Sequence, residues 1–243
     1  MNDDYVWDAL VRRLGTTSLL AREDAEAIRR LPVSIRSFQA DQIIVRDGDR
    51  PTECCLVIEG FCHRSKTIAD GGRQILSIHI PGEIPDLQSL HLAVMDHDLT
   101  TMSDCRLGFI SHTALREMLR SRPSLAELFW RDTLIDAAMF RDWIVNVGQR
   151  PAVSRVAHML VEIRERLRAI GRTSGSSYAL PMTQERIAEA MGISPVHANR
   201  VIRTLREDGI LDLNRGQVTV LDERRLQDLA DFDPRYLHQS PEK

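Results

Sequence analysis

The chain of 243 residues contains no apolar run that approaches the roughly 20 residues needed for a membrane-spanning helix. Near its start, Asp3 and Asp4 stand where a secretory signal peptide would carry positive charge. These two absences exclude the common membrane-spanning and secreted classes. We therefore expect a cytoplasmic protein with no membrane partner.

Cysteine is scarce, with only four residues, and they lack the spacing of a disulfide framework or a zinc site. In a reducing compartment we expect all four to be thiols, and burial is the usual state of such residues. Two of them are adjacent in a strand-like run, so their side chains should point to opposite faces of a sheet. The four cysteines are Cys54, Cys55, Cys62 and Cys105.

An excess of positive charge is also missing, because the formal net charge is -3. From Arg150 onward, however, 15 basic residues face 13 acidic ones, whereas 17 face 22 before it. The weakly basic second part is a modest signal for nucleic-acid binding. The length of the chain favours two domains, and a hydrophobic content of 43% suffices for a core. The local placement of charge matters more than the total, because attraction to phosphates is screened over about 10 Å.

Residues 183–206, TQERIAEAMGISPVHANRVIRTLR, have the spacing typical of a helix-turn-helix. Thr183 is placed to cap the first helix, and Ser194 followed by Pro195 is placed to begin the second. Gly192 can adopt the left-handed conformation that ends the first helix, and Ala188 is small where the helices should cross. The residues that fit the pattern are Ile187, Ala188, Met191, Gly192, Ile193, Ala198 and Val201.

The second of these helices carries Arg200, Arg203 and Arg206 and no acidic residue between 194 and 206. Arginines on a helix in a major groove can contact phosphates and the O6 and N7 atoms of guanine. Two short strand-like runs, 209–213 and 217–220, follow around a turn and complete a winged helix. The pattern predicts binding to double-stranded DNA, although a helical hairpin used only for packing has similar spacing.

Residues 34–114 contain short strand-like runs separated by turns rich in glycine and aspartate. Such regularly spaced strands favour an antiparallel barrel or jelly roll, a fold that often encloses one ligand. We expect helices at 7–14 and 23–31 to flank it. The runs are residues 42–45, 54–58, 61–68 and 73–80.

A long helical stretch at 124–147 carries apolar residues on more than one face, so it needs two packing partners. One partner is its own barrel, and the simplest second partner is the same helix of another subunit; a fully buried helix in a monomer is the alternative. Gly148, Arg150 and Pro151 then suggest a hinge before a helix at 153–167. The expected α+β chain has a jelly-roll domain (1–121), a dimerisation helix with hinge (122–149) and a winged-helix domain (150–243).

This order of elements resembles the Crp/Fnr family of bacterial transcription regulators, whose founding member is the cyclic AMP receptor protein. The resemblance covers nearly the whole chain and is most specific in LPMTQERIAEAMGISPVHANRVIRTLREDGIL, in CLVIEGF with the Gly71-Gly72 turn, and in Pro81-Gly82-Glu83. It implies a homodimer that binds a palindromic promoter site and contacts RNA polymerase when an effector reorients its DNA-binding domains.

By motif position, the resemblance implies that Thr183 and Ser194 hold phosphates and that Arg200 contacts a base. Family members commonly place glutamate where this chain has Val196, so the resemblance does not carry over a TGTGA or TTGAT half-site. Val196 could instead pack against a thymine methyl group. The residues expected at the DNA are Thr183, Gln184, Ser194, Pro195, Val196, His197, Asn199, Arg200, Arg203 and Arg215.

The effector region departs further from the cyclic nucleotide binders of the family. Gly82 and Glu83 are present, but no arginine lies between Ile84 and Asp104 to neutralise a cyclic phosphate. We therefore expect an unknown small-molecule effector and no tight binding of cyclic AMP. The expected pocket residues are Gly82, Glu83, Ile84, His97 and Asp98.

Other sensing chemistries have less support. No cysteine precedes Cys54, which argues against the iron–sulfur centre of oxygen-sensing relatives. Lone histidines and cysteines in a β domain are more often packing groups, so no cofactor or metal is expected. The two alternatives left open are a haem held by His79, His91 or Cys62 and a redox switch that uses Cys55, Cys62 or Cys105.

An enzyme built on the barrel is the main rival class. A metal-dependent cupin needs a His-x-His pair, and the neighbours of His79 and Glu83 in that pattern are Ser77 and Pro81. No catalytic triad or phosphate-binding glycine loop stands out elsewhere, so we expect neither catalytic residues nor an enzyme. A second rival is a sensor or binding module whose helix-turn-helix serves only packing or protein contacts.

Overall fold

The computed structural model describes residues 4–239 and divides the chain into two compact units. The first, the barrel unit, contains the chain up to Lys66, Ser77–Ala138 and the residues from Leu237 onward. The second, the helix-turn-helix unit, contains Thr67–Leu76 and Met139–Tyr236. The division falls between Ala138 and Met139, inside the long helix (Pro123–Gln149).

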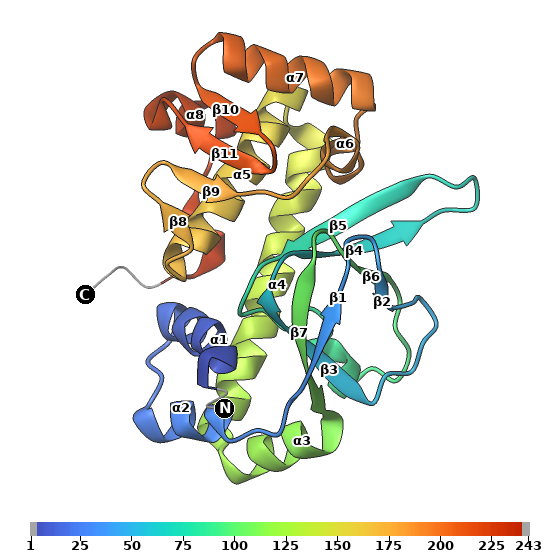
Figure 1. Ribbon diagram of the computed structural model, residues 1–243, viewed down its shortest axis with the longest axis vertical. Coiled ribbons are helices and arrows are strands. Elements are labelled where there is room, and N and C mark those ends of the chain that lie inside the picture. The colour runs from blue at the N-terminus through green and yellow to red at the C-terminus, as the bar shows by residue number, and fades with distance from the viewer. Residues whose placement is uncertain (1–3, 240–243) are drawn as a thin grey trace. The chain divides into compact units, whose positions relative to one another are not determined.

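The strands between Ser34 and Ser111 form two antiparallel sheets, which confirms the predicted jelly roll and the α+β class (Figure 1). One sheet has the order β1-β7-β3 and the other the order β2-β6-β4-β5. Four strands were predicted as separate runs; β1, β6 and β7 were not. The strands are β1 (Ser34–Phe38), β2 (Ile43–Val45), β3 (Glu53–Glu59), β4 (Cys62–Thr67), β5 (Arg73–His79), β6 (Asp98–Thr101) and β7 (Cys105–Ser111).

Strand β3 is buried on both faces and separates two hydrophobic clusters. Cys54 and Leu56 pack in the cluster that includes Trp7 of the first helix. Cys55 and Val57 pack in the cluster between the sheets. The alternation follows from the two-residue period of a strand, and it confirms that the adjacent cysteines point to opposite faces. All four cysteines are free and buried, as predicted.

Helices flank the barrel strands and close the first cluster. The two predicted N-terminal helices are present as α1 (Asp4–Thr17) and α2 (Arg22–Arg29). A third helix, α3 (His112–Ser121), was not predicted; it begins where the Ser111 hydroxyl accepts a hydrogen bond from the backbone N–H of Ala114. The long helix α4 (Pro123–Gln149) extends two residues beyond the predicted C-terminal end.

The helix-turn-helix unit is arranged around α5, whose middle is buried on every side. Its four-stranded sheet has the order β10-β11-β9-β8. The hairpin β8–β9 and the helix α8 were not predicted. The remaining elements are α5 (Ala152–Ala169), β8 (Thr173–Ser174), β9 (Ser177–Ala179), α6 (Gln184–Met191), α7 (Pro195–Glu207), β10 (Leu211–Asn214), β11 (Gln217–Val220), α8 (Glu223–Ala230) and the 3-10 helix η2 (Pro234–Leu237).

Inside this unit, a buried carboxylate is compensated by three donors. Trp143 Nε1 donates to Glu162 Oε2 over 2.9 Å, and the Tyr236 hydroxyl donates to the same oxygen over 2.8 Å. Arg166 Nη1 donates to Glu162 Oε1 over 3.0 Å. A buried charge is tolerated when it is paired and hydrogen-bonded in this way, so the network fixes α4 against α5.

Among residues 4–239, no helix is long and apolar enough to cross a bilayer.

Gly82→Ala should destabilise the barrel unit more than Gly48→Ala does. Both glycines have a φ near +90°, so either substitution introduces the strain of a left-handed residue. Only at Gly82 would the new Cβ also lie 2.6 Å from the Ala9 backbone oxygen; at Gly48 it meets open space. We expect the free energy of unfolding to fall by roughly 2 kcal/mol more for Gly82→Ala. Equal urea midpoints for the two variants would contradict the close approach.

Candidate nucleic-acid interface

Helices α6 and α7 pack through small and apolar side chains and form the predicted helix-turn-helix. Gly192 ends α6 with φ 62° and ψ 40°, the left-handed conformation expected from its position. Its N–H and that of Ile193 both bond to the carbonyl of Ala188. The side chains buried between and beneath the two helices include Ile187, Ala188, Met191, Ala198, Val201, Ile202 and Leu205.

Both predicted N-caps are confirmed. The Thr183 hydroxyl accepts a hydrogen bond from Arg186 N over 3.2 Å, and the Ser194 hydroxyl accepts one from His197 N over 3.2 Å. Pro195 occupies the first turn of α7, where its missing N–H costs no helical hydrogen bond. Each capping hydroxyl keeps its own proton, so each can still donate to a phosphate oxygen at a helix N-terminus.

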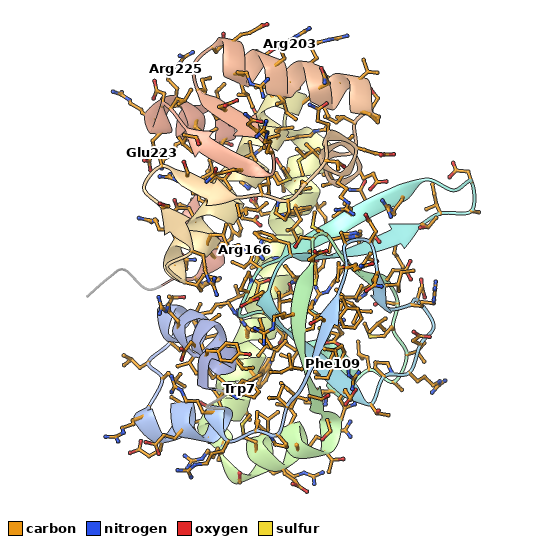
Figure 2. All side chains as sticks on the ribbon, viewed as in Figure 1. Trp7, Phe109, Arg166, Arg203, Glu223 and Arg225 are labelled. Atoms are coloured by element: carbon orange, nitrogen blue, oxygen red, sulfur yellow. The ribbon has the colours of Figure 1, made fainter. Side chains whose placement is uncertain are left out.

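The outward face of α7 consists of side chains that the helix does not need for its own packing. Val196 is 70% exposed, and Arg203 is 63% exposed, with Glu207 as a distant ion-pair partner at 4.0 Å. Figure 2 shows Arg203 extending outward from the helix. The exposed residues of this face are Val196, His197, Asn199, Arg200 and Arg203, all expected from the sequence.

Two further polar contacts on this surface were not evident from the sequence. Asn199 Nδ2 donates to Gln184 Oε1 of α6 over 2.6 Å. Arg206 Nε donates to Asp212 Oδ1 over 2.8 Å and its Nη2 donates to the Leu213 carbonyl over 2.6 Å. Arg206 therefore connects α7 to the wing, whereas Arg200 and Arg203 are left for other contacts.

The wing is the predicted hairpin of β10 and β11. Asn214 pairs with Gln217, which leaves Arg215 and Gly216 as the two turn residues. Their φ angles of 48° and 76° are those of a tight hairpin turn with two left-handed residues. The turn exposes Arg215 at the tip, a position from which a cation can reach a phosphate.

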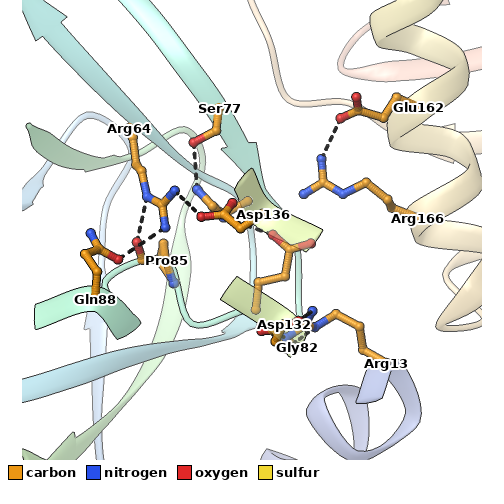
Figure 3. A network of polar contacts seen from close by, with 12 residues as sticks. Arg13, Arg64, Ser77, Gly82, Pro85, Gln88, Asp132, Asp136, Glu162 and Arg166 are labelled. Carbon is orange, nitrogen blue, oxygen red and sulfur yellow. Dashed lines mark hydrogen bonds and ion pairs between the residues drawn. The ribbon is translucent and has the colours of Figure 1, made fainter. Parts of the chain in front are cut away.

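The barrel unit holds a buried arginine that lies outside residues 84–104, the region in which the sequence lacks one. Arg64 of β4 donates from Nε to the Pro85 carbonyl over 2.7 Å and from Nη1 to Asp136 Oδ2 over 2.7 Å (Figure 3). Gln88 Oε1 lies 3.5 Å from Nη2. The signal in the sequence is that Arg64 lies within the predicted strand-like run 61–68; that the first four residues of β4 are all buried is evident only in the structure. A guanidinium is therefore present in this region, but Asp136 already neutralises it.

Two of the expected effector residues lie near this arginine. Glu83 Oε2 bonds to His79 Nδ1 over 2.9 Å, and His97 Nε2 lies 3.4 Å from the amide nitrogen of Gln88. Burial is the main cause that lowers the pKa of both histidines, and the charge of Arg64 lowers it further. These groups form a buried polar cluster, and its role in effector binding stays a prediction.

The other three expected effector residues have separate environments. The Gly82 carbonyl accepts a hydrogen bond from Arg13 Nε over 2.8 Å, and Arg13 also pairs with Asp132 (Figure 3). Asp98 Oδ1 accepts the backbone N–H of Asp47 over 2.9 Å. Ile84 belongs to the cluster that packs against α1.

His79 has no free ring nitrogen to bind a haem iron, because Nε2 of His79 bonds to Ser77 and Nδ1 bonds to Glu83. Within residues 4–239, no group of three or more histidine, cysteine or acidic side chains could hold a metal ion. For the redox alternative, the neighbouring thiol of Cys62 is the largest effect that lowers the pKa of Cys105 to about 7. The Cys105 thiol, together with burial, raises the pKa of Cys62.

Asp86 is a buried carboxyl group that bonds to a neighbouring strand. Its Oδ1 accepts the backbone N–H of Cys55 in β3 over 2.7 Å. Burial is the largest effect on this group and raises its pKa from 3.8 to about 7; the N–H bond and Arg64 act in the opposite direction. The group consequently changes charge near neutral pH.

Comparison with known proteins gives matches along most of the chain. Residues 154–229 match the Crp-like helix-turn-helix domain family, and residues 35–122 match the cyclic nucleotide-binding domain family. The chain is 25% identical to the transcriptional activator protein FnrL of Cereibacter sphaeroides over 225 residues, 89% of each chain. It is 24% identical to the nitrogen fixation regulation protein FixK of Bradyrhizobium diazoefficiens over 231 residues, 94% of this chain and 95% of FixK.

Solved structures show the same fold. FixK2 from Bradyrhizobium japonicum superposes with a TM-score of 0.75 at 23% identity, over 82% of this chain and 98% of FixK2. The c-di-GMP responsive regulator CLP from Xanthomonas campestris gives a TM-score of 0.62 at 16% identity, over 87% of this chain and 97% of CLP.

Asp86→Asn should change the pH dependence of stability. Because the pKa of folded Asp86 is raised to about 7, the folded state binds more protons than the unfolded chain between pH 3.8 and 7. The contribution of Asp86 to the free energy of unfolding is complete below pH 3.8 and is lost as the pH rises through 7. Relative to the native protein, the variant should gain roughly 2 to 3 kcal/mol between pH 5 and pH 8.

Urea unfolding at several pH values measures this gain. Asp233→Asn is the matched control, because a hydrogen bond from Arg235 lowers the pKa of that carboxyl and it stays ionised across the range. Parallel curves for the native protein and Asp86→Asn would show that Asp86 does not titrate as described.

Proposed function

The chain belongs to the Crp/Fnr family and is a DNA-binding transcription regulator, and on this premise we propose that it binds a palindromic promoter site as a homodimer. The observation that carries the proposal is the outward face of α7, where five polar or small apolar side chains are exposed and Arg200 has no ion-pair partner among residues 4–239. Such a face is complementary to the edges of bases and to phosphates in a major groove. A regulator of this kind works in the cytoplasm, where its promoters are.

The proposed contacts are of two kinds: contacts to phosphates that position the protein on DNA, and contacts to bases that recognise the sequence. Thr183 and Ser194 donate to phosphates from the two helix starts, and Arg215 reaches a phosphate from the wing. Arg200 reads a guanine, and Val196 packs against a thymine methyl group. Pro195 has no N–H to offer to DNA, so its place in the interface is steric. His197 and Arg203 add polar contacts at the edge.

The homodimer is supported by the unpartnered face of α4. Trp130, Leu134 and Ile144 are 68%, 57% and 69% exposed, although the opposite face buries Leu125 and Phe129 in the barrel core. The exposed residues are spaced as in a heptad seam, which suits a second copy of the same helix. A two-fold dimer would bring two copies of α7 to major grooves about 34 Å apart.

The proposed signal is a small-molecule effector other than cyclic AMP. Arg64 is the buried guanidinium of the barrel, and binding a cyclic phosphate there would require breaking its 2.7 Å pair with Asp136. Because the Arg64 side chain is buried, breaking this pair would leave an uncompensated guanidinium charge, which is costly. RNA polymerase is the further partner of a regulator that acts at promoters.

The alternative is a binding module whose helix-turn-helix only packs against other protein. Substitutions on α7 separate the two. Arg200→Ala should weaken operator binding by about 1 to 3 kcal/mol and relax the base preference at one position. Arg203→Ala should weaken binding to all duplexes alike and reduce the slope of log affinity against log salt by about 1.

Titration of labelled duplexes at several salt concentrations measures both effects. Arg172→Ala is the control, because this exposed arginine lies outside the helix-turn-helix and the wing. If neither substitution on α7 changes binding more than the control does, the packing alternative is favoured.

Leu134→Glu should dissociate the homodimer. At a two-fold seam the new carboxylate meets its own copy, so charge repulsion and the loss of apolar burial act together. We expect a monomer by light scattering and at least about a 100-fold loss of affinity for a palindrome, because the two half-sites no longer bind as one unit. Leu92→Glu replaces an exposed leucine outside α4 and should leave the dimer intact. A dimeric Leu134→Glu would place the interface elsewhere.

A further inference from the structure

A hydrogen bond between two exposed amide side chains joins the helices of the helix-turn-helix. Asn199 Nδ2 donates to Gln184 Oε1 over 2.6 Å. Gln184 is the first residue of α6, and Asn199 is the fifth residue of α7, beside Arg200 on the outward face. We infer that Gln184 orients the Asn199 amide so that Asn199 reads an adenine in the operator. The inference rests on the proposed function and adds to it a base and a positioning residue.

The direction of the bond determines which groups of Asn199 are left to face DNA. A carboxamide has two N–H donors and one carbonyl acceptor. Because one N–H is used by Gln184, the other N–H and Oδ1 remain, which is one donor and one acceptor on the same planar group. The side-chain carbonyl of Gln184 accepts the bond from Asn199, so the NH2 group of Gln184 is left to donate to a phosphate near the start of α6.

This donor–acceptor pair selects one base among the four. Adenine presents N7 as an acceptor and N6–H2 as a donor in the major groove, which complements the free edge of Asn199. Guanine presents two acceptors, N7 and O6, so Oδ1 would face another acceptor. Cytosine offers only a donor, and thymine offers an acceptor beside a methyl group. Arg200, with donors alone, suits the guanine that Asn199 rejects.

The packing of α7 fixes the face on which Asn199 lies. Its neighbour Ala198 is fully buried against α6, and Ile202 is buried one turn later. Helix rotation is therefore set by the core, and the bond to Gln184 removes the remaining freedom of the amide. A side chain held in its binding orientation loses less entropy on binding, so the bond should sharpen discrimination.

Selection from random duplexes with the full-length protein identifies the preferred half-site and tests the base. At one position, Asn199→Ala should lose about a tenfold or larger preference for adenine and leave the preference elsewhere unchanged. Both residues are exposed, so thermal unfolding of the variants should match that of the native protein. Loss of preference at a guanine or cytosine instead, or at no position, would overturn the inference.

Two substitutions at Gln184 test its positioning role. Gln184→Ala should reduce the same adenine preference, and combining it with Asn199→Ala should cause no further reduction. Gln184→Glu keeps an acceptor for Asn199 Nδ2 and should keep the adenine preference, but it should weaken binding to every duplex because a carboxylate replaces a phosphate donor. If Gln184→Ala leaves the preference intact, Gln184 does not orient Asn199.

The result for the native protein separates this inference from the proposed function. If it selects no sequence and retains no duplex, the proposed function fails, and the inference fails with it. If it selects a defined half-site that none of these variants alters, only the inference fails. A single affected adenine, shared by Asn199→Ala and Gln184→Ala, supports both.

Discussion

The close crossing of α6 and α7 is the constraint on which the DNA-binding surface depends. Ala188 is small enough to allow the crossing, and Gly192 takes the left-handed turn that redirects the chain within three residues. Because the inner side of α7 is filled by apolar residues, every polar side chain of its first two turns is left on the outside. A side chain larger than alanine at 188 would separate the helices and turn that face.

In both units, a buried charged side chain is compensated by hydrogen bonds and by a partner of opposite charge. In the helix-turn-helix unit, Glu162 accepts from two neutral donors and one guanidinium. In the barrel unit, Arg64 donates to a carbonyl and a carboxylate. Each charge has partners on α4 or α5, so pairing satisfies the charge and also fixes a helix. The result is that α4 is held in each unit by a polar contact as well as by apolar packing.

The parts of the fold that the sequence predicted well are those with strong local rules. The caps Thr183 and Ser194, the wing and the alternation of Cys54 and Cys55 follow from backbone geometry within a few residues. Strand β1 was missed as a separate run because SIRSF has only one apolar residue on each face, Ile35 and Phe38, so it shows no alternation of apolar and polar residues. Contacts between distant residues, such as Arg64 with Asp136, leave no periodic signal in one sequence. The bond between Asn199 and Gln184 was out of reach for the same reason.

The homodimer proposed through α4 agrees with what one recognition helix can distinguish. A single α7 reaches only a few base pairs, and each mismatched pair costs about 1 to 3 kcal/mol. A genome offers about a million or more competing sites, so the discrimination of one helix is too small to select a promoter. Two helices held at a fixed spacing double the number of base pairs read, and the free energies of discrimination add. In the proposed homodimer, the exposed apolar face of α4 would therefore be the surface that brings in the second recognition helix.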